Sequence, residues 1–91
     1  MAKKKFTTAK HTFLDVEGSQ FSESLIRKLR ENELFTYRDT ILKEHIYSID
    51  NVREALEEQE IALNKREEAS FKELQKLCED KKEDYFRFVF N

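Results

Sequence analysis

Three residues close together in the middle of the chain, His45, Ser48 and Asp50, are of the types that form a hydrolytic triad. Such a triad also needs a pocket and backbone amides placed to bind the oxyanion. This segment instead has the pattern of a helix end, so we interpret His45 as a half-buried packing residue and Asp50 as a helix cap. We therefore predict that the protein is not an enzyme and has no catalytic residues.

The single cysteine, Cys78, has lysines at positions 76, 81 and 82, and nearby cations lower the pKa of a thiol and activate it. Glu79 and Asp80 lie beside it as well, and it borders an apolar stripe, so we interpret it as a small core residue. One cysteine and two distant histidines, His11 and His45, leave no ligand pair at a chelating spacing for zinc. We expect no metal and no cofactor.

Six carboxylates in the second half of the chain would suit either a calcium site or a mimic of nucleic-acid phosphates: Glu54, Glu57, Glu58, Glu60, Glu67 and Glu68. Carboxylates on a helix usually form a solvated face, and the basic residues Arg53, Lys65 and Arg66 dilute the charge of this group. We interpret the group as a solvated helix face.

The N-terminal segment is basic: Lys3, Lys4, Lys5 and Lys10 are interleaved with Phe6 and Phe13. Lysines and aromatic rings together can follow a phosphate backbone and stack on bases. The chain as a whole has a net charge of −2, however, and lacks the basic footprint of a dedicated nucleic-acid binder. A nucleic-acid-associated protein that uses these four lysines is therefore the alternative to the function that we prefer.

Protein binding is the preferred function, and two apolar surfaces support it. The tail alternates, which places Phe86, Phe88 and Phe90 on one face of a strand and Tyr85, Arg87 and Val89 on the other. We expect the phenylalanine face to pack inside and the opposite face to bind another protein. A helical stripe that would form a homodimer seam consists of Val52, Leu56, Leu63, Leu74 and Leu77.

Backbone-breaking residues are nearly absent, because the chain has no proline and one glycine, Gly18. Capping residues at Ser22, Thr36 and Asp50 then predict three helices, two short ones within 19–49 and one long acidic one over 50–84. A competing prediction breaks the long helix near Asn64 and caps it again at Ser70, with Glu73 completing a capping box. We prefer the continuous helix, because no glycine is present to close a tight helical hairpin.

The two ends of the chain alternate between apolar and polar residues, which predicts a basic strand or arm over 1–17 and an aromatic strand over 85–91. An unpaired aromatic strand would aggregate, so the C-terminal strand should pair with the N-terminal one in a two-stranded element. The predicted fold class is α+β and mainly helical, in a single small domain spanning residues 1–91.

The expected function is that of a non-catalytic regulator or inhibitor that docks on a larger protein. A compact chain of this kind, rich in lysine and glutamate, would also suit a phage-type accessory or host-takeover protein. No apolar run reaches the roughly 20 residues of a membrane span, and no signal peptide is recognisable, so we expect a cytoplasmic protein with no membrane partner.

Overall fold

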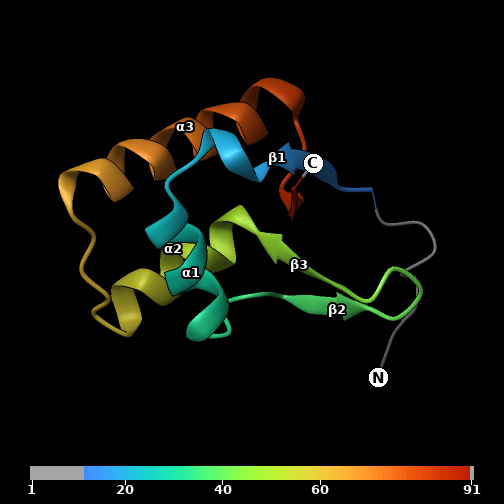
Figure 1. The fold of residues 1–91 in the computed structure, drawn as a ribbon, viewed down its shortest axis with the longest axis horizontal. Coiled ribbons are helices and arrows are strands. Elements are labelled where there is room, and N and C mark those ends of the chain that lie inside the picture. The colour runs from blue at the N-terminus through green and yellow to red at the C-terminus, as the bar shows by residue number, and fades with distance from the viewer. Residues whose placement is uncertain (1–11, 91) are drawn as a thin grey trace.

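Four strands and three helices follow one another in residues 12–90, the part of the chain that the computed structural model describes (Figure 1). In chain order they are β1 (Leu14–Glu17), α1 (Glu23–Glu31), β2 (Tyr37–Asp39), β3 (Glu44–Ser48), α2 (Ile49–Glu58), α3 (Lys65–Lys81) and β4 (Tyr85–Val89). A short 3₁₀ turn, η2 (Gly18–Gln20), links β1 to α1.

The strands form one mixed sheet in the order β1-β4-β3-β2. β1 pairs with β4 in parallel, Val16 lying opposite Phe88, whereas β4 pairs with β3 and β3 with β2 in antiparallel fashion. The predicted pairing of the C-terminal strand with the N-terminal strand is thus present. The predicted two-stranded element is wrong, because β4 is a central strand of a four-stranded sheet in the described residues.

One face of the sheet carries the core and packs against all three helices. The side chains of Val16, Tyr47, Phe86 and Phe88 lie on this face, and the Tyr47 ring stacks on the Phe86 ring at a centroid distance of 5.5 Å. The helices contribute the rest of the cluster, including the fully buried residues Leu25, Leu29, Val52 and Leu74. The predicted inward packing of Phe86 and Phe88 is therefore confirmed, whereas Phe90 is 57% exposed.

The opposite side of the sheet faces away from the helices, because successive side chains of a strand point to opposite faces. We call this side the outer face, and the pairing register assigns to it Asp15, Glu17, Tyr37, Asp39, Glu44, Ile46, Ser48, Tyr85, Arg87 and Val89.

The predicted second helix is wrong, because residues 37–48 form the hairpin of β2 and β3. Thr36 is not a helix cap, and its hydroxyl oxygen accepts hydrogen bonds from the Ser48 amide and the Asn51 side chain. The turn is closed by Asp39, whose carboxylate accepts from the backbone amides of Ile41 and Leu42, both at 2.9 Å. A helix N-cap makes the same bonds, so it is the pairing of β2 with β3 that makes this segment a hairpin.

The predicted continuous helix over 50–84 is also wrong, because α2 ends at Glu58 and α3 begins at Lys65. Ser48 caps α2, and Asp50 lies in its first turn. The second cap is Asn64, which forms a reciprocal capping box with Glu67, so the alternative prediction of a break near Asn64 is confirmed but not its cap at Ser70.

All three helices end in the same way, at a non-glycine residue in the left-handed conformation. Glu33, Glu60 and Lys82 have φ values of 54°, 53° and 55°. After each of them, the next amide donates to a carbonyl five residues back: Leu34 to Leu29, Ile61 to Leu56 and Glu83 to Cys78, each at 3.0 Å. This is the Schellman motif, which glycine usually completes.

The hairpin at residues 37–48 and the interruption between α2 and α3 change the fold class. Helices account for 49% and strands for 22% of the described residues, so the prediction of a mainly helical α+β fold is wrong. The protein is a small α+β domain in which three helices cover one face of a four-stranded mixed sheet over residues 12–90.

Candidate functional site

The triad-type residues do not form a catalytic site. The His45 ring stacks on Phe35, with ring centroids 4.1 Å apart. Ser48 is three residues further along the same strand, so its side chain lies on the opposite face, where it accepts from the Asn51 amide. Asp50 is exposed and its carboxylate lies 2.7 Å from the Arg53 guanidinium. The three side chains are therefore engaged in separate structural contacts.

Cys78 lies in the core and is 2% exposed, as predicted. Burial raises the pKa of its thiol to about 11, and the negative charges of Asp84, Glu83 and Asp50 act in the same direction. The thiol is thus protonated at neutral pH, which is the inert form.

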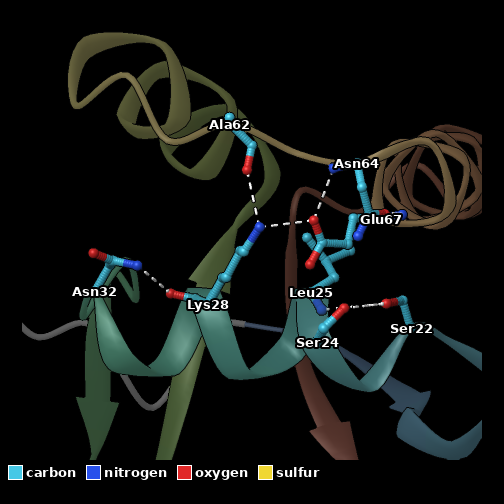
Figure 2. A network of polar contacts seen from close by, with 8 residues as sticks. All are labelled: Ser22, Ser24, Leu25, Lys28, Asn32, Ala62, Asn64 and Glu67. Carbon is cyan, nitrogen blue, oxygen red and sulfur yellow. Dashed lines mark hydrogen bonds and ion pairs between the residues drawn. The ribbon is translucent and has the colours of Figure 1, made fainter.

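Glu67 differs from the other predicted acidic residues, because it is buried between two helices (Figure 2). Lys28 of α1 donates to its carboxylate at 2.8 Å, and the Asn64 amide donates at 2.9 Å. Burial alone would raise the pKa of Glu67, but the bonds from Lys28, Asn64 and Ser24 lower it to about 2. The remaining predicted acids are exposed: Glu54, Glu57, Glu58, Glu60 and Glu68.

The network around Lys28 has a structural task. Its ammonium group also donates to the Ala62 carbonyl at 2.9 Å, so one side chain joins α1 to the α2–α3 connection and to the start of α3 (Figure 2). The lysine is partly exposed and the carboxylate is 1% exposed. Because both partners are engaged in holding helices together, we assign this pair to stability.

The outer face is the surface that most resembles a binding site. Three of the predicted partner-binding residues, Tyr85, Arg87 and Val89, lie there and are half-buried. Tyr37 of β2 joins them, its ring 6.1 Å from that of Tyr85. Within residues 12–90 all three helices belong to the core on the other side of the sheet, but Ile46 on the outer face is 0% exposed, so only part of this face is open.

Arg87 on the outer face interacts with several surrounding acidic residues. Its Nε donates to Asp15 at 2.7 Å, and its guanidinium carbon lies 5.6 Å from the Phe13 ring centroid. The bond to Asp15 and the charges of Asp15, Glu44 and Asp39 raise the pKa of Arg87, against the opposing effect of burial. Burial raises the pKa of Tyr37 too, with contributions from Asp39, Tyr85 and Glu83. The face thus combines aromatic rings with an excess of negative charge.

The predicted homodimer stripe is mostly inside the domain. Val52, Leu56 and Leu74 lie in the core of a single chain, at 0%, 8% and 0% exposure. Leu63 and Leu77 are partly buried and pack against the same core. The break between α2 and α3 folds the stripe inward, so its three buried members cannot form the seam that we expected.

The hairpin tip is an apolar feature that the sequence interpretation missed. Ile41 is 89% and Leu42 is 44% exposed, and the Asp39 turn holds their backbone in place. The second of the two short helices predicted within 19–49 would have contained both residues. Asp39 is a residue type that such turns favour, since its carboxylate accepts from amides two and three residues later, but a helix N-cap makes the same bonds and the local sequence does not separate the two.

The predicted nucleic-acid residues Lys3, Lys4, Lys5 and Lys10 lie outside the described residues. In the part of the chain that is described, no group of three or more histidine, cysteine, aspartate or glutamate side chains is arranged to hold a metal ion. None of the helices in residues 12–90 has both the length and the apolar composition needed to cross a membrane. The chain matches no protein-family model, and no curated protein or solved structure is significantly similar to it.

Proposed function

We propose that this chain is a non-catalytic protein-binding domain that docks on a larger protein through its outer face. The observation that carries the proposal is the pair Tyr37 and Tyr85, which lie beside Arg87 on the sheet face opposite the core. Tyrosine and arginine are the residue types enriched in the energetically dominant parts of interfaces.

The charge of this face favours a basic partner. Among the described residues it carries four carboxylates, from Asp15, Glu17, Asp39 and Glu44, and one guanidinium, that of Arg87. Lysine or arginine side chains of a partner would meet complementary charge on this face. A nucleic acid would place phosphates against the same carboxylates, and Arg87 already pairs with Asp15. We therefore propose a protein partner over a nucleic acid.

The role of a small regulator or inhibitor is part of this proposal. A domain of 91 residues whose candidate catalytic groups are engaged in structural contacts is suited to acting by occupying a surface of another protein. An accessory protein of a bacterial virus is one setting in which such domains act. We propose no homodimer through the stripe, because Val52, Leu56 and Leu74 lie in the core.

Site-specific cross-linking in lysate of the native host tests the proposal. A photo-reactive benzophenone amino acid at position 44 lies on the outer face, and the same group at position 57 lies on the exposed surface of α2. We expect nuclease-resistant protein adducts from position 44 and not from position 57. Excess unlabelled wild-type protein should compete with adduct formation.

A charge-matched pair of variants supplies the control. Asp15→Lys should weaken adduct formation from position 44, whereas Glu57→Lys, which changes the net charge equally, should leave it unchanged. Adducts that form equally from both positions would contradict the proposal. Adducts that are lost on nuclease treatment would favour the nucleic-acid alternative.

A further inference from the structure

The first strand lies at an edge of the sheet. In the order β1-β4-β3-β2, β1 pairs with β4 on one side, and no other described strand pairs with it on the second side. An edge strand presents backbone N–H and C=O groups that another extended chain can pair with. Proteins use this property to bind peptides by adding a strand to a sheet.

A groove follows this edge. It has a volume of about 430 Å³ and is lined by residues of β1 and α3. These two elements lie near each other in Figure 1. Phe21 and Leu77, both half-buried, give it apolar contact surface. Charged side chains complete the lining, with Asp15 and Glu17 on the strand and Glu73, Lys76 and Asp80 on the helix.

The charge of the groove selects the occupant. Among the described residues that line it, four carboxylates accompany one ammonium group, so a basic segment is complementary. Asp15 is already paired with Arg87, and we therefore assign the attraction chiefly to the exposed acids Glu73 and Asp80. A second copy of this chain is disfavoured, because pairing two β1 edges would bring Asp15 and Glu17 against like charges.

We propose that β1 is the docking edge and that an extended segment of the partner, rich in lysine or arginine, adds to the sheet beside Leu14–Glu17. This proposal rests on the proposed function and names the partner's chemistry. Side chains of the added strand alternate between the two faces of the sheet. Those that point towards α3 are basic and meet Glu73 and Asp80, with their methylene stems against Phe21 and Leu77, and those between them are apolar and lie on the outer face. The recognised pattern is therefore alternating basic and apolar residues.

The probe for the test is the capped peptide Lys-Val-Lys-Val-Lys-Val, titrated into the full-length chain and followed by amide hydrogen exchange in nuclear magnetic resonance spectra. We expect the amides of β1 to exchange at least about tenfold more slowly at saturation, as new hydrogen bonds form. The edge strand β2 on the opposite side of the sheet should be unaffected. Protection at β2 instead of β1, or no binding at millimolar peptide, would overturn the proposal.

Two controls separate strand addition from simple charge attraction. The same peptide N-methylated at alternate residues keeps its charge but cannot pair, so equal affinity of both peptides would overturn the proposal. The double variant Glu73→Lys with Asp80→Lys should bind about tenfold more weakly. The charge-matched double variant Glu57→Lys with Glu58→Lys, on exposed positions of α2, should bind within about twofold of wild type.

The outcomes also distinguish the two proposals. If position 44 cross-links a partner protein while the peptide never protects β1, then the edge proposal fails and the protein-binding function stands. If the peptide protects β1 but no adduct forms from position 44, then the edge binds basic chains and the outer face is not the docking surface.

Discussion

Replacing the left-handed helix-ending residues with glycine should stabilise the protein. Glu33, Glu60 and Lys82, together with Lys43 in the hairpin turn, have φ values of 53° to 58°. In this conformation a Cβ atom approaches the following carbonyl oxygen, which costs about 1–2 kcal/mol for residues other than glycine. Glycine loses more conformational entropy on folding than other residues do, and this loss offsets about 0.5–1 kcal/mol of the gain in stability. Each change should therefore stabilise by about 0.5–1 kcal/mol.

The local charge modifies this value from site to site. Glu33 and Glu60 place a negative charge at a helix C-terminus, where the helix dipole is unfavourable to it, whereas Lys82 places a favourable positive charge there. Glu60→Gly should thus gain more than Lys82→Gly. Comparison with alanine at the same site removes this term, because both variants lose the charge and only alanine keeps the Cβ atom.

Urea denaturation followed by circular dichroism measures the effect. We expect Glu60→Gly to be more stable than Glu60→Ala by about 1 kcal/mol, and the melting temperature to differ by about 4–8 °C per kcal/mol in a domain of this size. At the exposed helical position 57 the order should reverse, with Glu57→Gly less stable than Glu57→Ala by about 1 kcal/mol. A Glu60→Gly variant no more stable than Glu60→Ala would refute the reasoning.

Three further predictions concern single contacts. Glu67→Gln should lower the free energy of unfolding at pH 7 by up to about 3 kcal/mol, because a Glu67 pKa lowered from 4.5 to about 2 stabilises the fold above pH 4.5. The difference in stability between wild type and variant should vanish as the pH falls from 4.5 towards 2, and acid titrations of stability measure it. Gly18→Ala should displace the Phe90 ring, because a Cβ atom there would lie 2.3 Å from it, and the new ring environment should be visible in aromatic proton spectra while the backbone φ stays normal. Truncation after Asp84 should unfold the protein, because it removes the central strand and the fully buried Phe86, and a melting temperature equal to that of wild type would contradict the sheet topology.

Period-two alternation in the tail was a reliable signal. It placed Phe86 and Phe88 inside and Tyr85, Arg87 and Val89 on the other face, because only one register keeps the phenylalanines buried. The Ser22 cap was identified correctly for a similar reason, since its position is fixed by the apolar residues that follow it. Both inferences depend on neighbours in the sequence alone, which is why they succeeded without knowledge of the tertiary contacts.

The segment from Thr36 to Ser48 was ambiguous in sequence. Tyr37, Ile41 and Ile46 fit a helical stripe by their spacing, but short apolar runs do not distinguish strands from helices. In the structure these residues differ in exposure: Ile46 in β3 is 0% exposed, and Ile41 at the hairpin tip is 89% exposed. Pairing of β3 with β4 decides the outcome, and that long-range contact is not visible in the local pattern.

The prediction of one long helix was wrong because it relied on the lack of glycine within residues 50–84. We took glycine to be required after a helix, but Glu60 completes the turn at a modest energetic cost, and Lys82 does the same before β4. The Asn64–Glu67 capping box was present in the sequence and is a stronger signal than the missing glycine, since its two reciprocal bonds stabilise the new helix start.

The turn at Lys82 also sets the candidate binding surface. It reverses the chain from α3 into β4 with three residues between them and a hydrogen bond from the Glu83 amide to the Cys78 carbonyl. A shift of one residue in the β4 register would exchange the faces, burying Arg87 and exposing Phe86. Burying an unpaired guanidinium is strongly unfavourable, so the register that the turn favours is also the one that the core requires. The same local geometry that the sequence interpretation overlooked therefore keeps Tyr85 and Arg87 on the outer face.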